Sequence, residues 1–340
     1  MRRSAAALRP PARVWFRSRE FRAATEVKRG DGAMTEQAKP AMRAGVVGAG
    51  VFGGFHAGKY AVDPRVDFVG VFDPDAARCA ALAGRHGVRA FARLDALIAE
   101  TDALTVASPA PTHGPAARAA LDAGRHVLVE KPVATSLEDA DAMVAAAAAK
   151  GLILQVGHQE RFVFEAMGLF AIDEPPTVIE ARRFGAFSER GSDVSVTLDL
   201  MTHDIDLARL LARRAPVAEL DATTIRERTA FADRAEARIV FANGVEARLA
   251  ASRLHHDRER VMRLTYPSGV VEVDFVAKTF TNTTPYPLDP NFAEAPDAKD
   301  SLGANVAAFV GAVLDGGAAT ISGADGREAL AVALRVDNEG

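Results

Sequence analysis

The sequence predicts an α/β protein with a doubly wound parallel sheet in its N-terminal half and an α+β domain in its C-terminal half. The second domain is expected to hold a large open, mainly antiparallel sheet. From Met42 to about residue 160, short apolar runs alternate with helical segments, which indicates parallel strands joined by crossover helices. After residue 160, apolar and polar residues alternate with a period of two, the pattern of antiparallel strands with one covered face.

The composition excludes several classes of protein. The chain has 340 residues, is 49% hydrophobic and 25% charged, and carries a net charge of −4, so neither nucleic acid nor a membrane surface is an expected partner. No apolar run reaches the roughly 18 residues that span a bilayer, and we expect a cytoplasmic protein. The single cysteine, Cys79, excludes an intrachain disulfide and a multi-cysteine metal site, and its helical context predicts a buried structural thiol.

The first 30 residues differ from the rest of the chain. They hold nine Lys and Arg residues against two Glu and lack the continuous apolar stretch of a secretory signal, although a transit peptide shares this composition. We expect residues 1–40 to be a disordered or mis-started extension, because Met34 and Met42 are alternative starts. The further segments that we expect are a first domain at 42–160, a second at 161–325, and a helix at 326–340 that packs back on the first domain.

The elements of the first domain follow from local signals. A buried-strand run, "RAGVVGAG", leads into a helical stretch, "VFGGFHAGKYAV", and a second strand, "VDFVGVFD", ends in an acid. The helix in "PDAARCAALAGRHG" has Pro74 near its start and Gly87 at its end, the expected start and stop signals. Further strands are expected in "DALTVASP", "HVLVEKP" and "LILQVG", with helices at about 113–123 and 136–149.

The second domain has the alternation and turn residues of an antiparallel sheet. Strands are expected in "TVIEARRFG", "VAELDATTIRERT", "AEARIVFANGVEARLAASRL" and "RVMRLTYPSGVVEVDF". Asn243-Gly244 and Ser268-Gly269 lie between alternating runs, which predicts hairpin turns. Two helices, near 302–314 and 325–336, are expected to close the chain.

A glycine-rich loop follows the first strand. Gly48, Gly50 and Gly53 fit the pattern G-x-G-x-x-G. In this pattern the first glycine permits a tight turn, the second lets the backbone approach a pyrophosphate, and the third lets helix and strand pack closely. The helix that begins at Val51 and Phe52 would then offer its free N–H groups to the phosphates. The loop therefore predicts a dinucleotide site.

An acid at the end of the second strand supports this prediction. Asp73 lies 20 residues beyond Gly53, where a carboxylate would bind the ribose hydroxyls of the adenosine. The same carboxylate would repel a 2′-phosphate, so NAD is favoured over NADP, although Arg78 lies close enough in sequence to accommodate such a phosphate.

The stretch "DLMTHDIDL" in the second domain gathers three carboxylates, a threonine and a histidine. On a helix, Asp199 and His203 would share one face, with Asp206 one turn beyond, where it would orient His203 or the substrate. Asp204 is expected to cap the helix or to pair elsewhere. Taken alone, the stretch also fits an ordinary amphipathic helix with a solvated polar face.

Several motifs in this order resemble the Gfo/Idh/MocA family of oxidoreductases. They are "GAGVFGGFHAG", "VFDPD", "ASPAPTHGPAARAAL", "HVLVEKP" and "LDLMTHDIDLARLL", and the likeness runs from about residue 42 to the end. The resemblance implies a Rossmann domain followed by an open-sheet domain that contacts further copies, giving a homodimer or homotetramer. It also implies NAD(P)-dependent oxidation or reduction of sugars, inositols and their derivatives.

The resemblance also implies roles for individual residues. Lys131 matches the lysine that approaches the reacting hydroxyl and the nicotinamide, and Asp199 and His203 match the family's acid and proton-transferring histidine. Asp199 could fix the tautomer of His203, and the sequence leaves open whether Lys131 or His203 is the general base. The positions that match cofactor-contacting residues of the family are Ser108, Pro109, His113 and Glu130.

The run "GHQERF" is similar to the family branch that oxidises nucleotide-linked N-acetylamino sugars. His158 and Arg161 are therefore expected to bind the substrate, Arg161 through an anionic group, with an interdomain salt bridge as the alternative. The branch usually continues with Asn-Pro, which Val163 and Phe164 replace here. No metal site is expected, because "ASRLHHDRER" lacks a carboxylate cluster with ligand spacing.

Two other functions compete with sugar oxidation. One is the oxidation of a dihydrodiol or the reduction of a small carbonyl on the same fold. The other is a non-catalytic protein that senses NAD(P), which the presence of Lys131, Asp199 and His203 together makes the weaker alternative.

Overall fold

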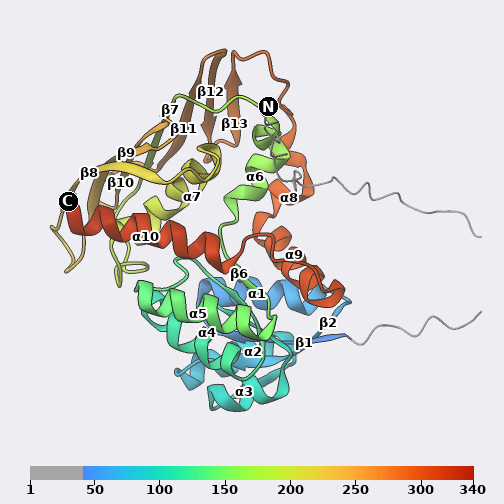
Figure 1. The fold of residues 1–340 in the computed structure, drawn as a ribbon. Coiled ribbons are helices and arrows are strands. Elements are labelled where there is room, and N and C mark those ends of the chain that lie inside the picture. Colours follow the sequence, from blue (N-terminus) through green and yellow to red (C-terminus); the bar gives the residue numbers. More distant parts are fainter. Residues whose placement is uncertain (1–40) are drawn as a thin grey trace, which may run out of the picture. The chain divides into compact units, whose positions relative to one another are not determined.

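The computed structural model describes residues 41–340 (Figure 1). The expected extension at residues 1–40 lies outside the described residues. Among the residues that are described, no helix is long and apolar enough to cross a membrane.

The first half of the described chain forms a six-stranded parallel sheet with the order β3-β2-β1-β4-β5-β6. The order reverses between β1 and β4, as in a doubly wound sheet, which confirms the predicted fold class. Its strands are β1 (Met42–Val47), β2 (Val66–Phe72), β3 (Arg89–Phe91), β4 (Ala103–Val106), β5 (His126–Val129) and β6 (Leu154–Val156). Its helices are α1 (Val51–Val62), α2 (Ala76–His86), α3 (Leu94–Glu100), α4 (His113–Asp122) and α5 (Leu137–Lys150), with a 3₁₀ turn at Ala110–Thr112.

Local signals set the bounds of these helices. Asp75 caps α2 by accepting hydrogen bonds from the N–H groups of Ala77 and Arg78, and Gly87 ends it in the left-handed conformation with φ 66°. Cys79 is a buried free thiol in α2, as predicted, and its Sγ lies 3.3 Å from the carbonyl oxygen of Val71. The short elements β3 and α3 were not predicted, because they carry too few residues for a clear period.

The second half forms a seven-stranded sheet with the order β13-β12-β11-β7-β10-β9-β8, in which only β7 and β10 pair in parallel. Both predicted hairpins are present, joining β9 to β10 and β11 to β12. The strands are β7 (Val178–Phe184), β8 (Val217–Ile225), β9 (Arg234–Phe241), β10 (Glu246–Ser252), β11 (Glu259–Tyr266), β12 (Gly269–Asp274) and β13 (Thr279–Asn282).

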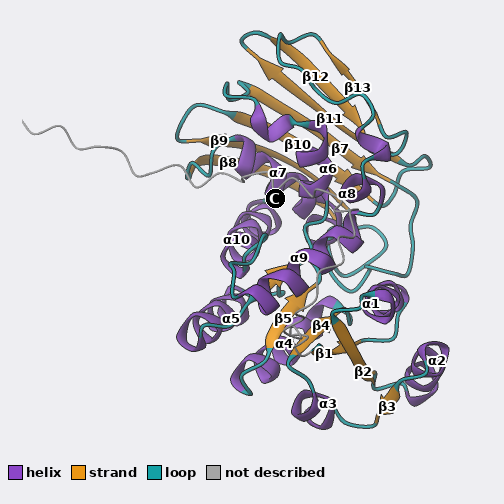
Figure 2. Cartoon of the chain, turned by 90° about the vertical axis from the view of Figure 1, so that its right-hand side faces the viewer, coloured by secondary structure: helices purple, strands orange, loops and turns teal. Residues whose placement is uncertain are grey.

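Helices cover one face of this sheet and leave the other face bare (Figure 2). On the covered face, alternate residues such as Ile179, Leu249 and Leu264 are buried in the larger apolar core. The helical segments here are α6 (Glu160–Met167), a π-helical turn η3 (Thr197–Met201) and α7 (Thr202–Leu211). Short segments follow at Leu169–Ala171, Phe292–Glu294 and Pro296–Lys299, the last being α8.

The two closing helices return the chain to the first sheet. In α9 (Ser301–Asp315), Val306, Phe309 and Val310 pack in the smaller apolar core with residues of β1 and α1, although this helix lies within the range expected for the second domain. The last helix, α10 (Gly323–Glu339), contacts α5 and β6 of the first half and α7 and β8 of the second. A capping box at Ser322 and Asp325 fixes its first turn.

Candidate active site

The glycine loop has the geometry that a dinucleotide requires. Gly48 has φ 101°, and a Cβ there would lie 2.7 Å from the carbonyl oxygen of Ala107. A Cβ at Gly53 would lie 1.8 Å from the carbonyl oxygen of Gly48, so only glycine lets α1 pack this closely on the loop. A Cβ at Gly50 would meet no atom of the described residues within 4 Å apart from those of Gly50 itself and its chain neighbours, which leaves room for a ligand.

The start of α1 is free to bind phosphate. Gly50 is the N-cap residue and supplies no side-chain cap, and the first turn, at Val51 and Phe52, holds no acidic residue. The first N–H groups of the helix thus keep their hydrogen-bonding capacity for an anion. Nearby, the carboxylate of Asp73 at the end of β2 accepts hydrogen bonds from the N–H groups of Ala49 (2.7 Å) and Asp75 (2.8 Å). Its Oδ1 also accepts from Nη2 of Arg78 at 3.4 Å, whereas Oδ2 retains a lone pair for a ribose hydroxyl.

His113 joins two loops at the ends of the neighbouring strands. Its Nδ1 lies 2.7 Å from the carbonyl oxygen of Pro132, and its Nε2 lies 2.8 Å from that of Ser108. Burial lowers the pKa of His113. The segment from Ser108 through Pro109, which follows β4, is therefore held beside the segment that carries Lys131.

Glu130 is buried at the end of β5, and its carboxylate bonds to a residue of α1. Its Oε1 lies 2.8 Å from Nε2 of His56 and accepts from Nε2 of Gln159 at 3.3 Å. Burial raises the pKa of Glu130, but the hydrogen bond and charge of His56, together with the charges of Lys131 and His113, outweigh burial, and the net pKa lies below its usual value. Sequence reasoning missed His56. The available signal was a polar residue on the buried face of a helix, which predicts a hydrogen-bond partner on the strand that the helix covers.

Lys131 and Asp199, two of the predicted catalytic residues, are in direct contact. The Nζ of Lys131 donates to the main-chain oxygen of Asp199 at 2.6 Å and to its Oδ1 at 3.1 Å. Gly191, with φ 79°, packs against the same carboxylate, where a Cβ would lie 2.5 Å from Oδ2.

The expected contact between Asp199 and His203 is not formed. The Nδ1 of His203 is buried and has no hydrogen-bond partner among the described residues. The prediction assumed a regular helix, but Asp199 lies in the π-helical turn that precedes α7, and the wider turn changes the face on which its side chain lies. Asp199 thus positions Lys131 and does not set the tautomer of His203.

His203 is the neutral base candidate of the site. Burial, followed by the positive charges of Lys131 and Arg183, holds the pKa of His203 well below the usual value of an imidazole. The ring of His158 lies edge-on beside it, with 6.4 Å between ring centroids. The Nδ1 of His158 is also buried without a hydrogen-bond partner in the described part of the chain, at 4.0 Å from Oδ2 of Asp206.

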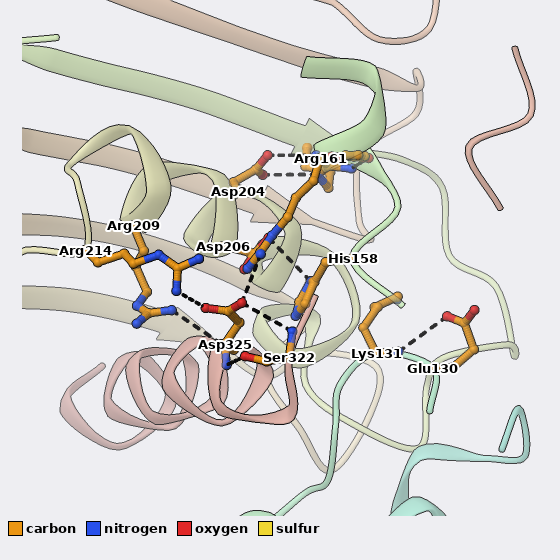
Figure 3. A network of polar contacts seen from close by, with 12 residues as sticks. Glu130, Lys131, His158, Arg161, Asp204, Asp206, Arg209, Arg214, Ser322 and Asp325 are labelled. Carbon is orange, nitrogen blue, oxygen red and sulfur yellow. Dashed lines mark hydrogen bonds and ion pairs between the residues drawn. The ribbon is translucent and has the colours of Figure 1, made fainter. Parts of the chain in front are cut away.

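Arg161 forms buried salt bridges (Figure 3), although both partners, Asp206 and Asp325, lie within the range 161–325 that was expected for the second domain, so the pairs are not the interdomain bridge of the alternative. Its Nε donates to Oδ2 of Asp206 at 2.7 Å, and its Nη1 donates to Oδ2 of Asp325 at 3.1 Å. Arg161 is 8% exposed, so its guanidinium is not available as a free anion-binding group. Asp206, which was expected to orient His203 or the substrate, is occupied by Arg161.

A second buried ion pair crosses the site. Asp204 pairs with Arg183 of β7, which fits the expectation that it caps the helix or pairs elsewhere. Arg183 also binds Glu160 at the start of α6. Sequence reasoning missed Arg183 and Glu160. The signal for Arg183 is its place in the inward-facing register of β7, after Ile179 and Ala181.

Two family models match this chain, one in each half. A family model described as "Oxidoreductase family, NAD-binding Rossmann fold" matches residues 42–158, and a model of the "GFO/IDH/MocA C-terminal domain" matches residues 168–272. The UDP-N-acetylglucosamine 3-dehydrogenase of Acidithiobacillus ferrooxidans is 38% identical over 304 residues, which cover 87% of this chain and 96% of that protein.

Two solved structures are similar in fold. A crystal form of the same Acidithiobacillus ferrooxidans dehydrogenase matches with a TM-score of 0.78 and 34% identity, covering 88% of this chain and 97% of that one. The WlbA dehydrogenase of Bordetella pertussis, in complex with NADH and UDP-GlcNAcA, matches with a TM-score of 0.77 and covers 88% and 96%. At 22% identity, this second likeness supports the fold alone.

We predict that Gly53→Ala abolishes binding of the dinucleotide and lowers the melting temperature, because its methyl group would overlap the carbonyl oxygen of Gly48. Gly58→Ala, in the same helix, is the matched control: its Cβ meets no atom within 4 Å, and it should keep or raise stability by up to about 1 kcal/mol. Thermal unfolding and NADH fluorescence titration measure both effects. Equal behaviour of the two variants would contradict the close packing described here.

We predict that Asp206→Asn destabilises the fold by about 3–5 kcal/mol at neutral pH, since it leaves the buried charge of Arg161 with one partner fewer. Burial raises the pKa of Asp206, but His158 and Arg161 lower this pKa by a larger amount, so the net pKa lies below the usual value of a carboxyl group. The contribution of Asp206 to the free energy of unfolding is therefore fully present above the pKa of an unfolded-state carboxyl group. It is lost as the pH falls through the depressed pKa of the folded state.

Urea unfolding of wild type and variant at several pH values measures this contribution. Asp173→Asn is the matched control, because Asp173 is exposed and lies 3.7 Å from Arg213 in a surface pair. A loss in Asp206→Asn no larger than in the control would rule out a structural role for the buried pair.

Proposed function

The chain belongs to the Gfo/Idh/MocA family of NAD-binding oxidoreductases, and from that premise we propose that it oxidises a ring hydroxyl of a UDP-N-acetylamino sugar. The observation that carries the proposal is the contact of Lys131 with Asp199 beside a neutral, buried His203. The relative that matches nearly end to end, a UDP-N-acetylglucosamine 3-dehydrogenase, supports the substrate class.

The residues of the glycine loop fit NAD. The open position at Gly50, the uncapped start of α1 and the carboxylate of Asp73 offer a pyrophosphate site and a ribose site in the expected order. When bound, NAD supplies the acceptor for the hydride that leaves the substrate carbon. The negative charge of Asp73 disfavours the 2′-phosphate of NADP. Through His113, the loop after β4 is held beside the lysine segment, where it would line the nicotinamide side.

Oxidation of a secondary alcohol also requires a base for the hydroxyl proton. His203 suits this role because its depressed pKa keeps the imidazole neutral at neutral pH, ready to accept a proton. Lys131 has a different task. Its ammonium group, oriented by two oxygens of Asp199, would hold the hydroxyl and stabilise the alkoxide that develops as the proton leaves.

His158 would contact the substrate next to the base. Its ring lies edge-on to that of His203, and its Nδ1 lies 4.0 Å from Oδ2 of Asp206. Glu130 contributes indirectly, by fixing the position of other site residues. Through His56 it links the phosphate-binding helix to the residue directly before Lys131, which keeps the cofactor helix and the lysine at a fixed separation.

We predict that His203→Gln lowers kcat for NAD-dependent oxidation by about 10²–10⁴ with unchanged NADH affinity. A base with a depressed pKa stays neutral until the pH falls through that pKa. The acid limb of kcat/KM in the wild type should therefore have its midpoint below pH 6.5, the usual pKa of histidine.

Substrates for this measurement are UDP-N-acetylglucosamine, its uronate form, N-acetylglucosamine and myo-inositol, each followed by NADH absorbance. Lys131→Met is the companion variant and should lose turnover while keeping an acid limb. Retention of the acid limb in His203→Gln would disprove its role as base. Turnover of no nucleotide sugar by a wild type that binds NADH would refute the substrate class.

We further propose that the bare face of the second sheet joins copies of the chain into a homodimer or homotetramer. A shallow depression of about 450 Å³ lies on this face, lined in part by Arg182, Asp221, Glu236, Arg238 and Arg248. Positive and negative side chains alternate there, as in the pair of Arg238 with Glu246 at 3.0 Å, so the face is complementary in charge to a second copy of itself.

We predict that wild type elutes as a dimer or tetramer and that Arg238→Glu with Arg248→Glu shifts it toward the monomer, because the exchange leaves like charges facing each other. Light scattering after size exclusion measures the mass. Arg93→Glu, an exposed pair with Asp95 in the first half of the chain, is the control and should keep the wild-type mass. A monomeric wild type would contradict the proposal.

A further inference from the structure

Two arginines face each other at the end of the covered face of the second sheet. Arg183 of β7 and Arg260 of β11 are register partners in an antiparallel pair, so their side chains leave the sheet side by side. Like charges directly opposite each other repel, and each guanidinium needs an anionic partner to be stable there.

Arg183 takes all the protein carboxylate oxygens at this position. It binds both oxygens of Glu160 at 2.7 Å and both oxygens of Asp204 at 2.7 and 3.0 Å. Burial lowers the pKa of Arg183, but the two carboxylates outweigh burial and raise it. Arg183 is thus fully partnered.

Arg260 is not. Within residues 41–340, no carboxylate lies within ion-pair distance of it, and no hydrogen bond to its guanidinium is formed. Its Nε is buried without a hydrogen-bond partner in this described part of the chain. Burial and the charges of Arg183 and Arg258 lower the pKa of Arg260, whereas Glu160 and Asp204 act on it only at a distance. On the opposite face of the same strand, Arg263 pairs with Glu272 at 2.9 Å.

Arg260 also lies near the reacting centre. It leaves the sheet beside Arg183, which binds Asp204, the residue directly after His203 on α7. Burial lowers the pKa of His203 most, and the positive charges of Lys131, Arg183 and Arg260 lower it further. The residue to which Arg183 is bound, Glu160, follows His158 by two positions at the start of α6. The partnerless guanidinium therefore faces the side of the sheet on which Lys131, His158 and His203 gather.

We infer that Arg260 binds an anionic oxygen group of the substrate. A guanidinium presents its donors in a planar fork that matches phosphate and carboxylate, and the buried Nε requires an acceptor that the described protein does not provide. The inference rests on the proposed function for the source of the anion, which is either the diphosphate of a nucleotide sugar or a carboxylate on its sugar ring. Arg161, the arginine that the sequence suggested for this role, is already used by Asp206 and Asp325.

The test measures ligand binding to the enzyme saturated with NADH, which blocks the cofactor's own phosphate site. UDP and glucuronate are titrated separately into wild type, Arg260→Met, Arg260→Gln and Arg263→Met, the last being the matched control on the outer face. We expect Arg260→Met to weaken binding of at least one ligand tenfold or more and Arg263→Met to leave both unchanged. Weakening with UDP assigns the diphosphate, and weakening with glucuronate assigns the carboxylate.

Wild-type affinity in both Arg260 variants, or no binding of either ligand by the wild type, would overturn the inference. Arg260→Gln keeps side-chain length and polarity and serves if the methionine variant does not fold. Turnover decides the proposed function separately. A wild type that binds UDP through Arg260 but oxidises no nucleotide sugar would refute the sugar substrate and leave the anion site intact.

Discussion

The arrangement of the site depends on the ion pairs that the buried guanidinium of Arg161 forms. Arg161 lies on α6 and is bound to Asp206 on α7 and to Asp325 at the start of α10 (Figure 3). A buried charge without a partner is costly, so the three helices can pack only where the carboxylates reach it. Because α10 also packs on α5 and β6, the same ion pairs fix α7 relative to the first sheet.

The position of His203, the proposed base, follows from this constraint. His203 lies on α7 directly before Asp204, which is held by Arg183 of the sheet, and three residues before Asp206, which is held by Arg161. The two anchors restrict both the rotation and the translation of the helix, and the imidazole needs no hydrogen bond of its own to be oriented. Its Nδ1, which has no partner among residues 41–340, and its depressed pKa fit a group kept neutral for proton transfer.

Lys131 is fixed from the first sheet by a separate set of contacts. Glu130 binds His56 on the phosphate-binding helix, and His113 binds the carbonyl oxygen that follows Lys131. The lysine then reaches across to Asp199, where the π-helical turn presents both a carbonyl and a carboxylate oxygen. The lysine and the histidine thus come from two independently braced elements, and the substrate hydroxyl is expected to lie between them.

The sequence by itself determined those features that depend on near neighbours along the chain. The strand and helix periods, the two hairpins, the glycine loop and the group of Lys131, Asp199 and His203 all follow from residues a few positions apart or from recognisable motifs. Only the tertiary structure decided which partners the charged residues have, because these partners are distant in sequence: Asp206 lies 45 residues from Arg161, and Asp325 lies 164 residues from it. No local pattern distinguishes an arginine that binds a ligand from one that binds a carboxylate of the same fold. For that reason the sequence indicated Arg161 as the anion-binding residue, whereas the fold leaves Arg260, the register partner of Arg183, with a buried Nε that has no partner among the described residues.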